Sequence, residues 1–305
     1  MLTKTTTISP VSPYNFELTA GFGALYPAIY TQDCEPAPTY QRLLNVNDTI
    51  VLSSVRSIGN TEHPKLSLEL TGTELNIENI TEAVSQIKWV LGCDQDLSQF
   101  YRMASNDHFF NRIIASQYGL HTPMRGSIFE SFVLAILGQQ ISNNIANSIR
   151  QTFIETYGLK RVIKGSSFYC FPTPATITGT NIESLMKLKL SRRKAEYLIG
   201  IAQLALDNDS VLNPEPHLND DEIIKHYMTI RGVGEWTAHW ALSNGKGSLD
   251  SFPSGDLALR KIISNQYFDG KLQTEEVIKN FARIWSPWRT YATTYLFGAI
   301  RKSLI

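Results

Sequence analysis

The spacing of hydrophobic residues changes near residue 80. Before that point, residues 65–70 alternate apolar and polar side chains, which is typical of a strand with one buried face. Residues 49–55 are rich in β-forming side chains and follow the turn signal Asn47-Asp48, so they predict a second strand. We expect residues 14–22 to form the opening strand or strand-turn of the domain. The first hundred residues therefore indicate a meander with one or two helices.

After residue 80 the spacing is helical. Ser127 and Glu130 form a capping-box pattern that predicts a helix start. The core face of this helix is predicted to consist of Phe129, Phe132, Val133, Ile136 and Leu137. Gly158 is expected to end this helix or the next one. The same spacing predicts helices at 181–189, 191–206, 220–229, 235–242, 257–265, 274–285 and 288–302.

These elements predict an α+β fold with two parts. We assign residues 1–110 to a β-containing domain and residues 111–305 to an all-helical region. A chain of 305 residues with 43% hydrophobic content suits two or three globular domains. No internal repeat or low-complexity segment interrupts this organisation.

Charge is neutral overall but uneven along the chain. Residues 1–110 carry 6 Lys/Arg and 12 Asp/Glu, whereas the remainder carries 22 and 16. This asymmetry is a weak indication that an anionic partner binds the second part.

Three separate cysteines, Cys34, Cys93 and Cys170, form no CxxC pair or Cys/His cluster. Structural zinc and iron–sulfur clusters are therefore not expected. The sequence shows neither a signal peptide nor an apolar run of membrane-spanning length. We expect a soluble intracellular protein, in the cytoplasm or nucleoid if bacterial and in the nucleus if eukaryotic.

A glycine turn joins two of the predicted helices. Gly232 and Gly234 flank Val233 and permit backbone angles that a side chain disfavours. Their N–H groups, with those of the following helix, can point at a DNA phosphate, and Thr237 lies directly behind them. Such a grip reads no bases. A plain helix–helix turn is the alternative interpretation.

The same turn can bind a cation on its other side. The backbone carbonyls of Met228, Ile230 and Val233 are candidate ligands for a structural Na⁺ or K⁺. We expect no other cofactor.

Asp256 follows Gly234 by 22 positions, on a turn that contains Pro253 and Gly255. A single carboxylate in such a place can stabilise developing positive charge or orient water. It also precedes a helical run, so a helix N-cap is the alternative role, and the two roles are compatible.

The segments GVGEWTA and FPSGDLALRK resemble the helix-hairpin-helix DNA glycosylase superfamily, and within it the AlkA-type 3-methyladenine DNA glycosylase II enzymes. Residues 12–22, 92–101, 135–142 and 285–292 are similar to further segments of that family in the same order. The resemblance implies a TATA-binding-protein-like antiparallel sheet domain and two helical subdomains with the active-site cleft between them.

The activity implied by the resemblance is excision of alkylated bases such as 3-methyladenine and 7-methylguanine from double-stranded DNA. The base leaves the helix stack, and its N-glycosidic bond is hydrolysed with Asp256 as the catalytic carboxylate. Bifunctional relatives carry a lysine at the position of Trp236, so the resemblance implies a monofunctional enzyme. We expect this enzyme to act as a monomer.

The resemblance also assigns the base pocket. Trp236, Trp240, Phe297 and Phe22 would line it, and aromatic faces attract cationic bases by roughly 0.5–2 kcal/mol. Each ring has core packing as its alternative role. Phe297 departs from the best-known relatives, which have tryptophan there.

Gln140 occupies the position of the wedge residue that fills the space left by the flipped base, where some relatives have leucine. Gln139 and Gln140 could instead cap a break between helices. Basic residues offer weaker candidates for phosphate contact. Arg192, Arg193 and Lys194 begin a predicted helix, and Arg289 follows a Pro-Trp corner that it could instead brace.

Two other functions remain open at this point. A related glycosylase could act on oxidised or deaminated bases, and a helix-hairpin-helix protein could bind DNA without catalysis. The presence of Asp256 at this spacing disfavours the second.

Overall fold

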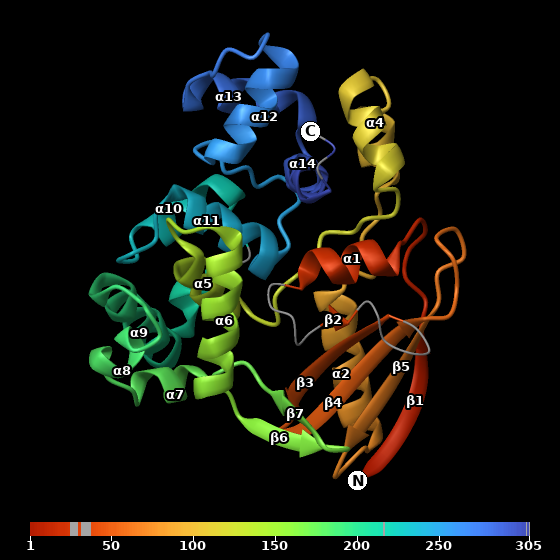
Figure 1. Cartoon of the computed structure of the whole chain (residues 1–305), viewed down its shortest axis with the longest axis vertical. Coiled ribbons are helices and arrows are strands. Elements are labelled where there is room, and N and C mark those ends of the chain that lie inside the picture. Colours follow the sequence, from red (N-terminus) through yellow and green to blue (C-terminus); the bar gives the residue numbers. More distant parts are fainter. Residues whose placement is uncertain (25–29, 32–37, 216, 303, 305) are drawn as a thin grey trace.

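The computed structural model describes residues 1–24, 30–31, 38–215, 217–302 and 304 of the 305-residue chain. An antiparallel sheet and two groups of helices make up the molecule, which confirms the predicted α+β fold (Figure 1). Cys34 lies outside the described residues, whereas Cys93 and Cys170 are buried free thiols. Among the described helices, none combines the length and the apolar character needed to cross a membrane.

The N-terminal sheet has the strand order β1-β5-β4-β3-β2, and every pair is antiparallel. Its strands are β1 (Leu2–Ile8), β2 (Tyr30–Thr31), β3 (Thr39–Val46), β4 (Thr49–Ser57) and β5 (Leu66–Gly72). β4 and β5 confirm both strands predicted from the sequence. Asn47 and Asp48 form the two-residue β3–β4 turn with φ of 47° and 62°, as a type I′ hairpin requires.

Helix α2 (Ile77–Val90) covers one face of this sheet. Leu66, Leu68 and Leu70 of β5 are buried and share a core with Ala83 and Ile87 of α2. The intervening positions of β5 are only half-buried. The alternation of apolar and polar residues in β5 therefore arises because one face of the strand packs against α2.

The prediction of a strand over residues 14–22 is wrong. These residues form helix α1 (Phe16–Gly23), because the Asn15 side chain accepts a hydrogen bond from the Leu18 amide at 3.0 Å and caps the helix. The opening strand is β1 instead, whose threonine-rich sequence lies against β5.

The first helical lobe has its own hydrophobic core. Its helices are α5 (Ile128–Gly138), α6 (Asn143–Tyr157), α7 (Pro174–Thr178), α8 (Ile182–Met186), α9 (Arg192–Asp207), the 3₁₀ turn η2 (Asp209–Val211), α10 (Asp220–Met228), α11 (Glu235–Ala241) and the π-helical turn η3 (Leu242–Lys246). The helices predicted in this region are confirmed to within a few residues. Gly158 ends α6, the second of the two helices that it could close.

A two-stranded sheet interrupts this lobe, which the sequence analysis expected to be all-helical. Strands β6 (Lys160–Ile163) and β7 (Ser166–Tyr169) pair as a hairpin and reach toward the N-terminal sheet (Figure 1). Ile163 and Phe168 pack there against Leu43 and Leu52. The hairpin therefore joins the lobe to the sheet domain.

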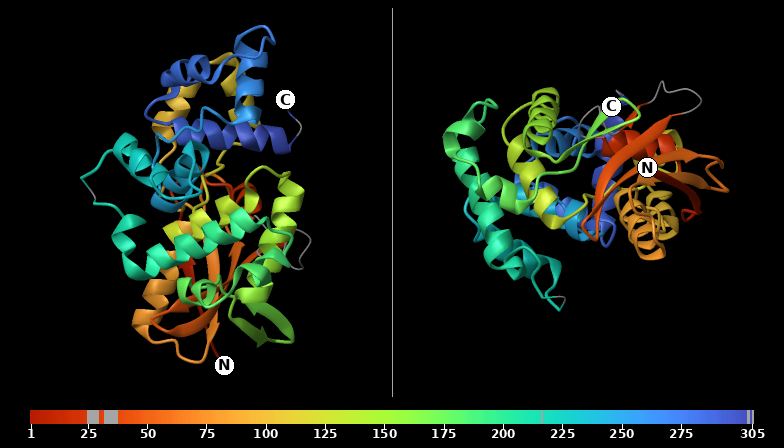
Figure 2. Two further views of the ribbon diagram at one scale, coloured as in Figure 1. Left: turned by 90° about the vertical axis from the view of Figure 1, so that its left-hand side faces the viewer. Right: turned by 90° about the horizontal axis from the view of Figure 1, so that it is seen from below.

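The second helical lobe combines two distant parts of the sequence. It contains α3 (Ser98–Ala104), α4 (His108–Ser116), α12 (Leu257–Tyr267), α13 (Glu275–Phe281), the 3₁₀ turn η4 (Ala282–Trp285) and α14 (Arg289–Arg301). These helices lie together at one end of the long axis, away from the sheet (Figures 1 and 2). The predicted boundary at residue 110 falls inside α4, within the core of this lobe.

The predicted capping box at α5 is half present. Ser127 accepts the Glu130 amide at 3.0 Å, as predicted. The Glu130 carboxylate, however, does not return to the Ser127 backbone but accepts from the Gly126 amide at 3.2 Å and pairs with Arg42 of β3. Since Glu130 and Arg42 are both largely buried, this ion pair links the sheet to the first lobe.

Candidate active site

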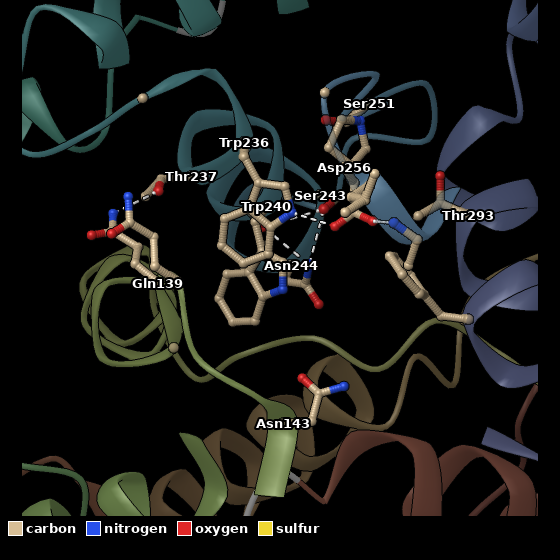
Figure 3. Close-up of a pocket in the computed structure, with 18 of the residues that line it drawn as sticks. Gln139, Asn143, Trp236, Thr237, Trp240, Ser243, Asn244, Ser251, Asp256 and Thr293 are labelled. Atoms are coloured by element: carbon tan, nitrogen blue, oxygen red, sulfur yellow. Dashed lines mark hydrogen bonds between the residues drawn. The ribbon is translucent and has the colours of Figure 1, made fainter. Parts of the chain in front are cut away.

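One large cavity lies between the two helical lobes, with a volume of about 1340 Å³. Residues from α5, α11, α12 and α14 line it, together with Phe22 of α1. Most of the site residues predicted from the sequence meet here: Phe22, Gln139, Gln140, Gly232, Val233, Gly234, Trp236, Thr237, Trp240, Asp256 and Phe297. Figure 3 shows several of them.

The glycine turn connects α10 to α11, so the predicted helix-hairpin-helix is present. Gly232 has φ of +90°, and a Cβ atom there would lie 2.3 Å from the Tyr197 ring. Gly234 has ordinary backbone angles and open space where a Cβ would be. Only the first glycine is therefore required by conformation, whereas the second leaves the start of α11 uncovered.

Gln139 and Gln140 lie at the break between α5 and α6 but are placed differently. The Gln139 amide donates to the Gly232 carbonyl and to the Thr237 hydroxyl, both at 3.0 Å. Gln140 is exposed with φ of +57° and also lines the cavity. Gln139 thus fastens the break to the hairpin, and Gln140 is the residue whose side chain is exposed there.

Asp256 is the N-cap of α12, and its carboxylate has three donors. Oδ1 accepts the amides of Ala258 at 2.8 Å and Leu259 at 3.1 Å. Oδ2 accepts the indole Nε1–H of Trp236 at 2.9 Å (Figure 3). A carboxylate offers about four acceptor positions. The capping role is therefore real, and it leaves Oδ2 beside the cavity with room for another donor.

Two tryptophans of α11 form an aromatic wall. The rings of Trp236 and Trp240 are 6.4 Å apart between centroids and inclined by 22°. The guanidinium of Arg125 lies over the Trp240 ring at 5.6 Å, a cation–π contact. Arg125 itself is buried and donates to the Gly23 carbonyl at 2.9 Å.

The opposite wall contains the other two predicted aromatic residues. Phe297 of α14 is half-buried and lines the cavity. Arg301, one helical turn further along α14, lies 4.2 Å over the Phe22 ring and donates to the Phe22 carbonyl at 2.8 Å. Phe22 therefore joins the sheet domain to the second lobe at the edge of the cavity.

Residues 133–287 match the model of the HhH-GPD superfamily of base excision DNA repair proteins, a segment of more than half the chain that contains the hairpin and Asp256. The chain belongs to this superfamily. The resemblance inferred from the sequence is thereby confirmed, and the protein is a base excision repair DNA glycosylase whose partner is DNA.

Individual relatives extend over most of this HhH-GPD protein. DNA-3-methyladenine glycosylase from Bacillus subtilis is 30% identical over 222 residues, covering 72% of each chain. DNA-3-methyladenine glycosylase 2 from Escherichia coli is 26% identical over 282 residues, covering 88% of this chain and 96% of its own. The structure of 3-methyladenine DNA-glycosylase from Archaeoglobus fulgidus superposes with a TM-score of 0.83 at 25% identity, covering 97% and 98%.

The proposed cation ligands of this HhH-GPD protein lie around the turn. Met228 is the last residue of α10, and the Ile230 carbonyl accepts the Val233 amide at 3.0 Å. These carbonyls remain a prediction. Among the described residues, no three His, Cys, Asp or Glu side chains gather as a metal site.

Sequence reasoning missed the buried His239, which ties the aspartate loop of this HhH-GPD protein to α11. Its Nδ1 accepts the Phe252 amide at 3.2 Å and lies 2.9 Å from the Ser251 hydroxyl. Burial, followed by the nearby Lys279 and Arg289, lowers the pKa of His239 from 6.5 to about 4. The imidazole is therefore neutral near pH 7. The helical spacing around His239 does not indicate that its side chain contacts Ser251 and Phe252 of a later loop.

The weaker basic candidates of this HhH-GPD protein are mostly engaged within it. Arg289 binds Asp250 through Nε at 2.7 Å and Nη2 at 2.8 Å, so it braces the corner before α14. Arg192 pairs with Glu196 at 3.5 Å, and Lys194 donates to the Leu137 carbonyl at 3.1 Å. Arg193 is exposed on the first turn of α9.

Proposed function

We propose that this protein is a monofunctional glycosylase that excises alkylated purines of the 3-methyladenine and 7-methylguanine type from double-stranded DNA, with Asp256 as the catalytic carboxylate. The observation that carries the proposal is the Asp256 carboxylate, held by three N–H donors beside an aromatic cavity. The substrate class is supported by the names of the Bacillus subtilis, Escherichia coli and Archaeoglobus fulgidus relatives.

The chemistry follows from the position of this carboxylate. Cleavage of the N-glycosidic bond leaves positive charge on the sugar, and a fixed negative charge stabilises it. Asp256 is the only carboxylate among the described residues that line the cavity. Protein donors fill three of about four acceptor positions of this carboxylate. The remaining position can accept a hydrogen bond from the attacking water and orient it.

The absence of a nucleophilic amine supports the monofunctional assignment. A lyase needs an amine that forms a Schiff base with the sugar. Within the described part of the chain, no lysine lines the cavity, and the expected lysine position holds Trp236, whose indole donates to Asp256. Water is therefore the nucleophile in this proposal, and the product is an intact abasic site.

The aromatic walls support a cationic base, but two of the four rings already contact a guanidinium. Arg125 lies over Trp240 and Arg301 over Phe22. A cationic base would therefore gain more from Trp236 and Phe297 than from the other two rings. A cationic base is therefore expected to bind best where its ring lies against Trp236 and Phe297.

DNA binding in this proposal uses the hairpin and the α5–α6 break. Gly234 leaves the start of α11 open to a phosphate, and Gln140 is placed to fill the space of the flipped base. A monovalent cation on the carbonyls of Met228, Ile230 and Val233 would strengthen the phosphate contact. We propose that the protein acts as a monomer.

The test is the Asp256→Asn variant on DNA treated with a methylating agent. Asparagine keeps an oxygen that can cap α12 but removes the negative charge, so we expect release of 3-methyladenine and 7-methylguanine to fall about 10²–10³-fold. Binding to an abasic-site duplex should be retained. Full base release by a DNA-binding variant would remove Asp256 from the mechanism.

Two controls test the rest of the proposal. A duplex with 8-oxoguanine should remain intact, and its cleavage without release of methylated bases would move the substrate class to oxidised bases. Borohydride should trap no covalent enzyme–DNA adduct, and a trapped adduct would contradict monofunctional chemistry.

A further inference from the structure

The helix that carries both tryptophans ends in a π-helical turn inside the cavity wall. This turn, η3, directly follows α11 and contributes Ser243 and Asn244 to the cavity lining. π-helical turns are rare and are frequently found at functional sites. The Asn244 carbonyl also accepts the Arg125 amide at 2.8 Å, which fixes the turn against the loop before α5.

The side chain of Asn244 has one orientation. Its Nδ2 donates to the Trp240 carbonyl at 3.0 Å and to the Ser243 hydroxyl at 2.9 Å. A backbone carbonyl only accepts hydrogen bonds, so a rotated amide would place two acceptors against each other. Oδ1 is therefore the atom directed away from these partners, as Figure 3 shows.

This oxygen is an available acceptor. Among the described residues, no hydrogen bond is made to Asn244 Oδ1. The two hydroxyl groups of the same wall are engaged within the protein. The Thr237 hydroxyl accepts from Gln139, and the Ser243 hydroxyl donates to the His239 carbonyl at 3.0 Å. Asn244 Oδ1 is thus an acceptor of this wall that is left for a ligand.

The position of Asn244 relative to Asp256 determines which edge of a bound base would face this acceptor. Trp236, Trp240 and Asn244 follow one another at intervals of four residues, and Trp236 is bonded to Asp256. The wall therefore extends from the carboxylate toward Asn244 over about 12 Å of helix axis. A base whose glycosidic bond lies at Asp256 and whose ring lies along the tryptophans presents its edge remote from the sugar to Asn244.

We propose that Asn244 Oδ1 accepts a hydrogen bond from an N–H group on the remote edge of the flipped base and so selects bases that carry an amino group there. Adenine and guanine derivatives carry such donors. The inference rests on the proposed function, because it takes the cavity as the base pocket and Asp256 as the site of bond cleavage. Asn244 is a specificity-determining residue in this assignment.

The experiment measures binding of two free bases by quenching of tryptophan fluorescence. The probes are 3-methyladenine and 3-methylpurine, which has the same ring without the amino group. We expect the wild-type protein to bind 3-methyladenine about 5–10-fold more tightly, the value of one hydrogen bond to a partly exposed amide. Equal affinity of the wild-type protein for both bases would overturn the assignment without any variant.

Two variants with the same chemical change sharpen the result. Asn244→Leu removes the acceptor and should bring the affinity ratio to about one. Asn143→Leu makes the matched change at the start of α6, elsewhere on the cavity lining, and should leave the ratio unchanged. A purely structural role of Asn244 would weaken both bases equally in Asn244→Leu and keep the ratio, which would contradict the proposal.

Base release from methylated DNA separates this inference from the proposed function. Wild-type protein that releases 3-methyladenine but binds both free bases equally overturns the role of Asn244 and leaves the glycosylase proposal intact. Protein that binds neither base and releases no methylated base overturns both.

Discussion

The two lobes build the same cavity in different ways. In the first lobe, one continuous stretch supplies the hairpin glycines, both tryptophans and Asn244 at helical intervals. In the second lobe, Asp256 caps α12 while Phe297 lies on α14, 41 positions later. The first wall follows from local sequence, whereas the second exists only once its helices have packed. The hairpin and the tryptophan pair are therefore local features, and the placement of the carboxylate beside them is tertiary.

Two hydrogen bonds from α11 join the walls near the carboxylate. Trp236 donates to Asp256, and His239 accepts the Phe252 amide of the same loop. Because α11 bonds the Asp256 carboxylate itself, a change in this helix is expected to reach the carboxylate directly. Helix α14 contacts the same loop further from the carboxylate, where Thr290 bonds Ser251. We expect three perturbations of the hairpin and α11 to have effects of decreasing size.

The largest effect is expected in the hairpin itself. Gly232→Ala forces a Cβ to within 2.3 Å of the Tyr197 ring at φ of +90°, so the turn must shift. We expect a loss of about 3 kcal/mol in unfolding free energy, measured by denaturant titration, with weaker binding to abasic-site DNA. Gly200→Ala is the matched control, since it lies within α9 with nothing near its Cβ, and it should gain about 0.5–1 kcal/mol. Equal stability of the two variants would mean that Gly232 is not conformationally required.

A comparable effect is expected from acidification through His239. Its pKa is lowered from 6.5 to about 4, so the unfolded chain binds the proton first and stability is complete above pH 6.5. As pH falls from 6.5 to 4, this group should remove about 3 kcal/mol.

The His239→Asn variant is the control, because every other titratable group contributes equally to the pH dependence of stability in the variant and in the wild type. The charged neighbours of His239 are Glu235 at 3.7 Å, with Lys279 and Arg289 lowering its pKa and Asp221 and Glu275 raising it. The stability advantage of the wild type over the variant should shrink by about 3 kcal/mol between pH 7 and pH 4. An advantage that is constant with pH would show that the buried imidazole does not titrate in this window.

The smallest effect separates the two tryptophans. Trp236→Phe keeps an aromatic ring but removes the Nε1–H donor to Asp256, so we expect the single-turnover rate of base release to fall about fivefold, or about 1 kcal/mol. Trp240→Phe leaves the Trp236 donor to Asp256 in place. This variant should therefore change the affinity for the base more than the single-turnover rate of base release. Identical rate losses in the two variants would show that the link to Asp256 has no part in the chemical step.

The fold was predictable from the sequence wherever the spacing of hydrophobic residues or a single helix-capping residue decides the local structure. The alternation through Leu66, Leu68 and Leu70 correctly placed β5, and Ser127 correctly placed the start of α5. Residues 14–22 were misassigned because the Asn15 cap outweighed their mixed pattern. The β6–β7 hairpin was missed because its strands are short and stabilised by packing on the sheet domain.

The site shows the same limit. The helix predicted over residues 235–242 contains both Trp236 and Trp240, but the sequence gave no indication that the Trp236 indole bonds Asp256, twenty positions away. Arg125 over Trp240 and Asn244 in the π-helical turn were missed for a related reason. Their roles depend on which atoms neighbouring helices present, and no periodicity reports that.

The Gln139 side chain has a consequence for DNA affinity in the proposed binding mode. One amide bonds both the Gly232 carbonyl and the Thr237 hydroxyl, so the α5–α6 break and the hairpin are fixed to each other in the free protein. Two loops that must be ordered against each other during binding reduce affinity by the entropy that they lose. Here that ordering occurs during folding, so in the proposed binding mode these two loops need not be ordered against each other when DNA binds.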